Sequence, residues 1–217
     1  MICIFDLDGT LLDTVGDIAA AVNHALAENR FPTHTTQNII PFLGNGTDKL
    51  LERALPQGER TPENVQKLRP SYQAYYDAHL TVFTKPYPGI VSLLTTLQTR
   101  GVKLAVASNK YHHAVEQIIK TVFPTIVFSA VFGHKEGTPT KPNPQLVREI
   151  LALCNEPLKA CLYVGDSDVD MQTARNAGVK ACGVTWGYKP RAVLVSYQPD
   201  FLVDTPSEIL SLIKFFD

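Results

Sequence analysis

Two aspartates at the end of an apolar run are the first residues in the chain whose types and spacing suit chemistry. Asp6 and Asp8 lie in FDLDGT at residues 5–10, directly after ICIF. In extended backbone they project to one side while Leu7 faces the other. One carboxylate can then serve as a nucleophile and the other as a general acid and base, given a cation that holds them together. A single acid there would indicate a turn, but two flanking a leucine favour a catalytic pair.

A second pair of acids follows another apolar run. Asp166 comes directly after ACLYV, and Asp170 lies one helical turn further on, facing the same way. Four carboxylates in one place repel one another unless a divalent cation is bound. Mg²⁺ takes hard oxygen ligands and leaves positions for water and phosphate. Ser167 and Asp168, between the two acids, are interpreted as N-cap residues of the following helix.

Two further polar segments suit the binding of phosphate. Ser108 follows the apolar run at 102–107, and with backbone N–H groups at a helix start it could bind phosphate oxygens, although serine there is also a common cap. Lys141 lies in the turn-rich segment GTPTKPNP. It is either a solvated surface lysine or the cation that offsets phosphoryl charge in a transition state.

The elements that must position these residues are parallel strands separated by helices. Apolar runs of strand length occur at residues 2–6, 102–107 and 160–164, with weaker candidates at 126–131, 179–184 and 200–203. Helical spacing of apolar residues fills the segments between them. This alternation predicts an α/β fold, a Rossmann-like three-layer core with a parallel sheet covered on both faces. Ligands of such sheets bind beyond the C-terminal strand ends, where the polar segments fall.

Residues 14–85 break the alternation, because they show helical periodicity and no convincing strand. We interpret them as a helical cap domain inserted after the first strand. The core domain is then discontinuous, with residues 1–13 and 86–217. Within the insert, Gly44-Asn45-Gly46-Thr47 leads into a helix carrying Lys49 and Arg53. This segment is either a turn with a solvated face or a contact for a small anionic substrate.

The amino-acid composition limits the classes of protein to which the chain can belong. The chain has 217 residues, 45% hydrophobic and 19% charged, with a net charge of −1, which suits a globular enzyme and favours neither nucleic acid nor a membrane surface as partner. The N-terminus lacks a basic segment, and no apolar run approaches the roughly 20 residues of a membrane span, so we expect a cytoplasmic protein. We interpret four cysteines as buried thiols rather than a zinc or disulfide set; they are Cys3, Cys154, Cys161 and Cys182.

Four segments, in order along nearly the whole chain, resemble the motifs of the haloacid-dehalogenase (HAD) superfamily of phosphatases. They are FDLDGT at 5–10, VASN at 106–109, KP at 141–142 and GDSDVD at 165–170. The resemblance implies that Asp6 attacks phosphorus to form an aspartyl-phosphate. Asp8 would protonate the leaving alcohol and then activate water.

The same resemblance implies a metal and phosphate site. Mg²⁺ would be held by the carboxylates of Asp6 and Asp166 and the backbone carbonyl of Asp8. Asp170 would support this shell through water or by orienting Lys141. Ser108 and Lys141 would hold the phosphoryl group.

Three segments are similar to the phosphoglycolate phosphatase subfamily. They are FLGNGTDKLLERAL in the insert, SNK at 108–110 and VTWGY at 184–188. They imply a small phosphorylated metabolite as partner, 2-phosphoglycolate. The substrate contacts this suggests are Thr10, Ser108, Asn109, Lys110, Gly46, Lys49 and Arg53.

Other reactions on this scaffold remain alternatives. Inorganic pyrophosphatase activity occurs among similar members of the superfamily and is one alternative. A β-phosphoglucomutase-like mutase would carry a cap histidine where this chain has Ile18, and a dehalogenase would lack Asp8. A non-catalytic relative would be expected to lose one of four residues that are intact here; they are Asp6, Asp8, Lys141 and Asp166. Both a monomer and a homodimer fit the sequence.

Overall fold

The computed structural model describes residues 1–216 and contains two compact units. The first comprises Met1–Asp13 and the chain from Pro86 onward, and the second comprises Thr14–Lys85. The division falls where the alternation of strands and helices breaks in the sequence. That the second unit acts as a cap stays a prediction.

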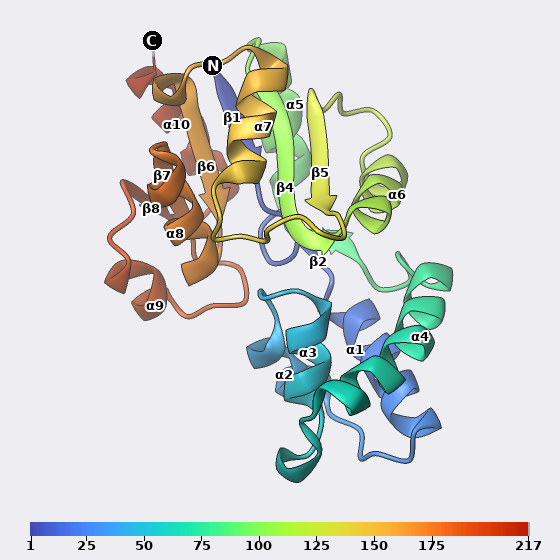
Figure 1. The fold of residues 1–217 in the computed structure, drawn as a ribbon. Coiled ribbons are helices and arrows are strands. Elements are labelled where there is room, and N and C mark those ends of the chain that lie inside the picture. The colour runs from blue at the N-terminus through green and yellow to red at the C-terminus, as the bar shows by residue number, and fades with distance from the viewer. Residues whose placement is uncertain (217) are drawn as a thin grey trace. The chain divides into compact units, whose positions relative to one another are not determined.

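The first unit is built on a six-stranded sheet whose neighbouring strands are all parallel, in the order β5-β4-β1-β6-β7-β8 (Figure 1). The strands are β1 (Ile2–Phe5), β4 (Lys103–Tyr111), β5 (Ala130–His134), β6 (Cys161–Gly165), β7 (Lys180–Val184) and β8 (Phe201–Val203). This confirms the predicted Rossmann-like sheet. The chain builds outward from β1 through β4 to β5, then returns to β6 on the other side of β1. The C-terminal ends of β1 and β6 therefore flank the switch point where such sheets bind ligands.

Helices cover both faces of this sheet. They are α5 (Ile90–Thr99), α6 (His112–Val122), α7 (Gln145–Cys154), α8 (Asp168–Ala177), α9 (Arg191–Ser196) and α10 (Ile209–Leu212), with 3-10 turns at Leu158–Ala160, Pro206–Glu208 and Ile213–Phe215. Figure 1 shows α7 and α8 in front of the sheet and α5 behind it. The α7–α8 face buries Ile4 of β1, Ala107 of β4 and Tyr163 of β6 in one apolar cluster. Alternation along β6 thus places Tyr163 on this face.

Two strands differ from their predicted bounds by more than one residue. The predicted strand at 126–131 is wrong by about four residues, because Ile126 closes a turn onto Phe123 and Val127 is 70% exposed, and pairing with β4 begins only at Ala130. The strand β4 also continues past residue 107, so SNK lies inside it rather than after it. A register shift against β5 between Ala107 and Tyr111 accompanies this extension.

The helix α8 begins where the sequence predicted. Ser167 is its N-cap and accepts a hydrogen bond from the Asp170 backbone N–H, while the Asp170 side chain accepts one from the Ser167 N–H, which forms a capping box. Asp168 is the first residue of the helix rather than its cap. The helix ends at Gly178, whose φ of 76° is the left-handed conformation that favours glycine.

The regular secondary structure of the second unit is helical, apart from Lys85 at the start of β3. Its helices are α1 (Val15–Glu28), α2 (Thr36–Ile39), α3 (Thr47–Ala54) and α4 (Pro62–Ala78), with 3-10 turns at Ile40–Phe42 and Gln57–Glu59. Ile18, Val22 and Leu26 lie on the buried face of α1, as helical spacing requires. Where the chain passes between the units, β2 (Leu12–Asp13) and β3 (Lys85–Pro86) form a small two-stranded sheet that the sequence pattern did not predict.

All four cysteines are buried free thiols, as predicted. Burial raises the pKa of the Cys3 thiol to about 12, so this group stays protonated and unreactive near neutral pH. Among residues 1–216, no helix is both long and apolar enough to cross a membrane.

Candidate active site

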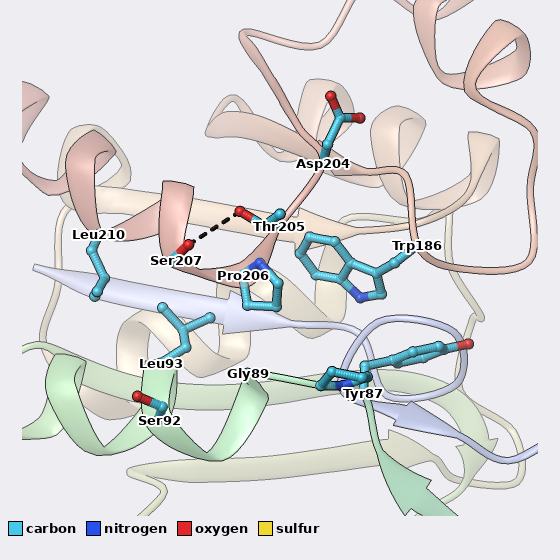
Figure 2. Close-up of a pocket in the computed structure, with 11 residues that line it drawn as sticks. Tyr87, Gly89, Ser92, Leu93, Trp186, Asp204, Thr205, Pro206, Ser207 and Leu210 are labelled. Carbon is cyan, nitrogen blue, oxygen red and sulfur yellow. Dashed lines mark hydrogen bonds between the residues drawn. The ribbon is translucent and has the colours of Figure 1, made fainter.

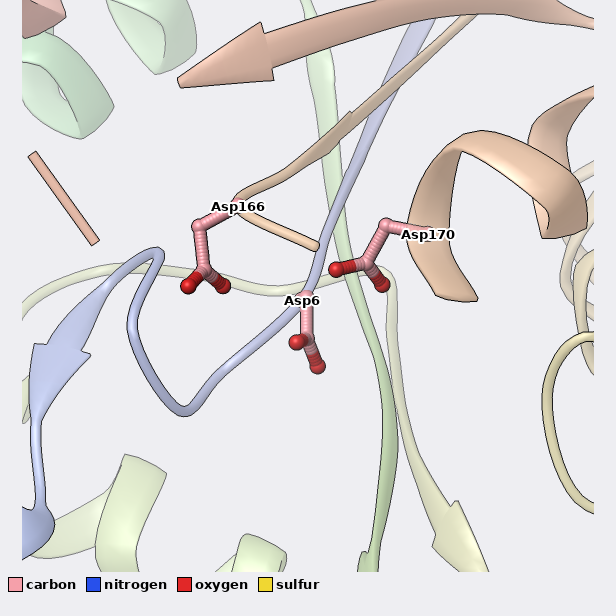
Figure 3. A group of neighbouring side chains, drawn as sticks. All are labelled: Asp6, Asp166 and Asp170. Atoms are coloured by element: carbon pink, nitrogen blue, oxygen red, sulfur yellow. The ribbon is translucent and has the colours of Figure 1, made fainter. Parts of the chain in front are cut away.

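Three carboxylates meet at the C-terminal ends of β1 and β6. Asp6 follows β1, Asp166 follows β6, and Asp170 projects from the first turn of α8 (Figure 3). One oxygen from each lies within 4.8 Å of the others, and all three residues are buried. The topology therefore brings Asp6 together with two acids that lie 160 and 164 residues further along the chain.

Burial and mutual repulsion disfavour the charged forms of these acids. Burial, with the charge of Asp170 as the next cause, raises the pKa of Asp6 well above its usual range. The same two causes raise the pKa of Asp166 to about 7. Such a cluster of hard oxygen donors becomes stable in its ionised form when positive charge is supplied.

Lys141 supplies part of that charge. Its Nζ atom lies 2.8 Å from Asp6 Oδ1 and 2.7 Å from Asp170 Oδ1, and the side chain is only 2% exposed. Burial alone would lower the pKa of Lys141, but the carboxylates of Asp170 and Asp6 outweigh it and raise that pKa well above its usual value. Lys141 is therefore a charged member of the site and not a solvated surface lysine.

Asn109 holds the backbone of this lysine. The Lys141 N–H donates to Asn109 Oδ1 at 2.8 Å, and Asn109 Nδ2 donates to the Lys141 carbonyl at 3.1 Å. The sequence assigned Asn109 to substrate binding. In the structure its side-chain amide fixes the loop before α7, so that Lys141 reaches the acids.

Asp8 lies in different surroundings from Asp6. After Asp6 the chain turns tightly, and the Leu7 carbonyl accepts hydrogen bonds from the backbone N–H groups of three residues; these are Thr10, Leu11 and Leu12. The Asp8 carboxylate is not part of the three-acid group; its Oδ1 atom accepts a hydrogen bond from Lys110 Nζ at 2.8 Å. Each of the two motif acids is thus paired with its own lysine.

Asp166 is held by the first motif and by the loop after β7. Thr10 Oγ1 donates to Asp166 Oδ1 at 3.1 Å, and the Tyr188 backbone N–H donates to Asp166 Oδ2 at 2.7 Å. The sequence assigned Thr10 to substrate binding, whereas the structure places its hydroxyl on Asp166. Trp186 Nε1 in turn donates to the Thr10 carbonyl at 3.0 Å.

The residue between Trp186 and Tyr188 must be glycine. A Cβ atom at Gly187 would lie 2.3 Å from both the Asp166 Cβ and the Gly9 carbonyl oxygen. Only a residue without a side chain lets this loop approach Asp166 closely enough for the Tyr188 hydrogen bond. The VTWGY segment is therefore a support for the acid site.

Tyr163 is a site residue that the sequence analysis missed. Its buried hydroxyl lies 3.1 Å from Lys141 Nζ and donates to Asp170 Oδ1 at 3.2 Å. The available signal was a phenol in the otherwise apolar strand ACLYV. Because phenols are also common in cores, this signal does not distinguish packing from a polar contact.

Ser108 is buried at the same edge of the sheet. Its hydroxyl accepts a hydrogen bond from the Lys110 backbone N–H at 3.2 Å. It is not a helix cap, because α6 begins only at His112. Its position near the end of β4, the neighbour of β1, is consistent with the phosphate contact predicted for it.

The substrate residues predicted in the insert lie in the second unit and have partners there. Lys49 forms an ion pair with Glu52 at 2.6 Å, and Arg53 Nη1 donates to the Phe42 carbonyl at 2.9 Å. Gly46 precedes α3 with a φ of 83°, which explains the glycine. Their contact with substrate stays a prediction.

A separate cavity of about 380 Å³ lies in the first unit beside Trp186 (Figure 2). It is lined by Tyr87, Pro88, Gly89, Ser92, Leu93, Trp186, Asp204, Thr205, Pro206, Ser207 and Leu210. None of these described lining residues is a lysine or arginine, and none belongs to the acid cluster. The cavity therefore lacks the charge that a phosphate site needs.

The acid cluster fits a hard divalent cation. It offers three buried carboxylates and one ammonium group, so a cation of two positive charges would balance it. Oxygen-only donors favour Mg²⁺ over metals that prefer nitrogen or sulfur. The second oxygen of Asp170 is already held by Ser167, so Asp170 chiefly orients Lys141.

The parallel sheet with buried acids and a lysine at its switch point is an arrangement suited to a hydrolase. Residues 3–184 match the haloacid dehalogenase-like hydrolase family, and the chain belongs to this family. A phosphoglycolate phosphatase from Aquifex aeolicus is 35% identical over 97% of this chain and 95% of its own length. One from Mannheimia succiniciproducens is 31% identical over 96% of each chain.

A solved structure shows the same fold. It comes from Lactobacillus delbrueckii subsp. bulgaricus, and its suggested activity is phosphoglycolate phosphatase. It superimposes with a TM-score of 0.92 at 32% identity, covering 98% of this chain and 97% of that one.

Proposed function

We propose that this protein is a Mg²⁺-dependent phosphatase that hydrolyses 2-phosphoglycolate through an aspartyl-phosphate on Asp6. The observation that carries the proposal is the position of Asp6, buried at the end of β1 with Lys141 Nζ 2.8 Å from its carboxylate. The phosphoglycolate phosphatases among its relatives support the choice of substrate.

In the first step a carboxylate oxygen of Asp6 attacks phosphorus. The bond between phosphorus and the ester oxygen breaks, and Asp8 gives a proton to the departing glycolate oxygen. The charge of Lys141 offsets the negative charge that develops on the phosphoryl oxygens, and the Ser108 hydroxyl donates to one of them.

In the second step water attacks the phosphorus of the aspartyl-phosphate. Asp8, now a carboxylate, takes a proton from this water. The bond between the Asp6 oxygen and phosphorus breaks, which releases inorganic phosphate and restores Asp6. The two steps therefore need Asp8 to exchange a proton while Asp6 remains unprotonated.

The residues that would hold Mg²⁺ are the carboxylates of Asp6 and Asp166 and the backbone carbonyl of Asp8. When bound, the ion supplies positive charge that orients and neutralises the phosphoryl group. Asp166 is preset for this role by Thr10 and Tyr188, and Asp170 keeps Lys141 in place.

The helical unit, residues 14–85, acts as a cap that excludes water from the reacting phosphoryl group. Gly46, Lys49 and Arg53 are its candidate substrate contacts. We place the reaction in the cytoplasm, where small phosphorylated metabolites occur.

Phosphate release from a panel of esters tests the proposal. The panel contains 2-phosphoglycolate, ethyl phosphate, a sugar phosphate and pyrophosphate, each with Mg²⁺ and with EDTA. We expect release that depends on Mg²⁺ and is fastest with 2-phosphoglycolate. A faster reaction with pyrophosphate would make the protein a pyrophosphatase, and no release from any member would contradict the proposed activity.

A further inference from the structure

We propose that Lys110 selects the substrate by binding a carboxylate on the leaving group of the phosphate ester. This inference rests on the proposed function, since it assumes that Asp8 protonates the leaving oxygen. The sequence resemblance linked Lys110 only to substrate binding in general. The inference assigns to this residue one particular group of the substrate, its carboxylate.

Lys110 is rigidly placed at the catalytic edge of the sheet. It lies near the C-terminal end of β4, the neighbour of β1, and its side chain is only 8% exposed. Its Nζ atom is 2.8 Å from Asp8 Oδ1, and its backbone N–H donates to Ser108 Oγ. The ammonium is therefore held at the predicted acid, Asp8, while the backbone of the same residue contacts the predicted phosphate contact, Ser108.

The chemistry of Asp8 fixes where the leaving group must lie. To pass a proton, the Asp8 carboxylate must come within hydrogen-bond distance of the ester oxygen. In 2-phosphoglycolate that oxygen is separated from the carboxylate carbon by one CH₂ group. The substrate carboxylate thus comes close to the groups that contact Asp8, and Lys110 is a cation among them.

Charge balance also favours a position of the substrate carboxylate beside Lys110. Lys141 is engaged by Asp6 and Asp170, and the phosphoryl group adds further negative charge beside it. A second anionic group brought into a buried site is strongly disfavoured unless a cation meets it. Lys110 can meet it because an ammonium carries three donors.

A comparison of matched esters tests this inference. Ethyl phosphate has the same ester oxygen and first carbon as 2-phosphoglycolate but no carboxylate. In Lys110→Met, we expect the ratio of kcat/KM for 2-phosphoglycolate to that for ethyl phosphate to fall about 10- to 100-fold, the size of one lost charge-assisted hydrogen bond. Lys110→Arg should keep most of the ratio. The control Lys180→Met, which breaks an ion pair with Asp200 at the start of β7, should keep all of it.

A binding experiment separates selection from catalysis. The probes are 3-phosphonopropionate, which replaces the ester oxygen of 2-phosphoglycolate with CH₂, and propylphosphonate, which also lacks the carboxylate. Calorimetric titration of the Mg²⁺-loaded protein should show that Lys110→Met weakens the first about 10- to 100-fold and the second much less.

The possible results separate the inference from the proposed function. If the unaltered protein shows no preference for 2-phosphoglycolate over ethyl phosphate, the proposed substrate is wrong. If it shows the preference and Lys110→Met retains it, Lys110 only positions Asp8 and the inference is overturned. Loss of the preference in Lys49→Met but not in Lys110→Met would place the selecting cation in the helical unit, which also overturns it.

Discussion

The hydroxyl of Tyr163 lies 3.1 Å from Lys141 Nζ and 3.2 Å from Asp170 Oδ1. It reaches this position from the sheet face that packs against α7 and α8, beneath the acid cluster. Tyr163 thus links the apolar core to the cation of the site. It does not contact the reacting groups directly and is a positioning residue for Lys141 and Asp170.

Replacing Tyr163 with Phe keeps the ring in the core and removes only the hydroxyl. We expect kcat to fall about tenfold, because one hydrogen bond that orients Lys141 is lost, with little change in KM. Steady-state kinetics on 2-phosphoglycolate measure both. Tyr197→Phe, at a partly buried ring packed against the same core cluster, is the control. Equal effects of the two substitutions on kcat would show that Tyr163 serves packing alone.

Asp6→Asn tests the nucleophile. The amide has the shape of the carboxylate but cannot form the acyl-phosphate, so we expect phosphate release to fall by at least about 10⁴-fold. The metal-free variant should remain folded, because the amide fills the same space and Asp170 still forms an ion pair with Lys141. Ordinary turnover by a well-folded Asp6→Asn protein would overturn the nucleophile assignment.

Thr10→Val tests whether the Thr10 hydroxyl holds Asp166 in place for metal binding. Valine fills the buried space of threonine but cannot donate to Asp166, so we expect about 10-fold weaker activation by Mg²⁺. Titration of activity with Mg²⁺ measures this, as does direct Mg²⁺ binding by calorimetry. Thr173→Val is a matched control, since Thr173 is equally buried but donates to the Val169 carbonyl within α8. An unchanged Mg²⁺ midpoint in Thr10→Val would contradict the role given to this hydroxyl.

The raised pKa of Asp166 predicts how stability depends on pH without metal. With a pKa of about 7 in the folded state against an ordinary value of 3.8, the folded protein binds a proton that the unfolded chain has released. The tighter proton binding by the folded state adds to the free energy of unfolding, and this stabilisation is fully present below about pH 4. It is lost as the pH rises towards 7, by at most about 1.4 kcal/mol per pH unit.

Mg²⁺ competes with these protons, so its stabilising effect should grow with pH. Scanning calorimetry at pH 5.5 and pH 8, with EDTA and with Mg²⁺, checks this. We expect the rise in unfolding temperature caused by Mg²⁺ to be larger at pH 8. Asp166→Asn should reduce that difference, and an effect of Mg²⁺ that shrinks from pH 5.5 to pH 8 would contradict the proposed site.

The sequence predicted the sheet well because its strands are continuous apolar runs buried on both faces. Those runs end in polar residues, so the pattern also located Asp6 and Asp166 at one edge. It misplaced the strand β5, since the apolar segment 126–129 has the composition of a strand but lies in the connection from α6. Composition does not show which apolar residues find a pairing partner.

The sequence predicted the acids of the site but not the hydrogen bonds that hold the site together. Residue type identified Asp6, Asp8, Asp166 and Asp170 as candidates, but the hydroxyl of Thr10 and the amide of Asn109 contact protein groups in the structure. These partners lie 156 and 32 residues away along the chain, and no local pattern encodes such pairs. Tyr163 was missed for the same reason.

Trp186 is the one tryptophan in the sequence, and its indole N–H is bonded to the carbonyl of Thr10, whose hydroxyl holds Asp166. The emission of a tryptophan responds to the polarity and hydrogen bonding around its indole, and a cavity also borders the Trp186 ring. Only Thr10 separates this indole from Asp166 in the carboxylate cluster. We expect ion binding at Asp166 to change this emission, so that intrinsic fluorescence would report ion binding without a label.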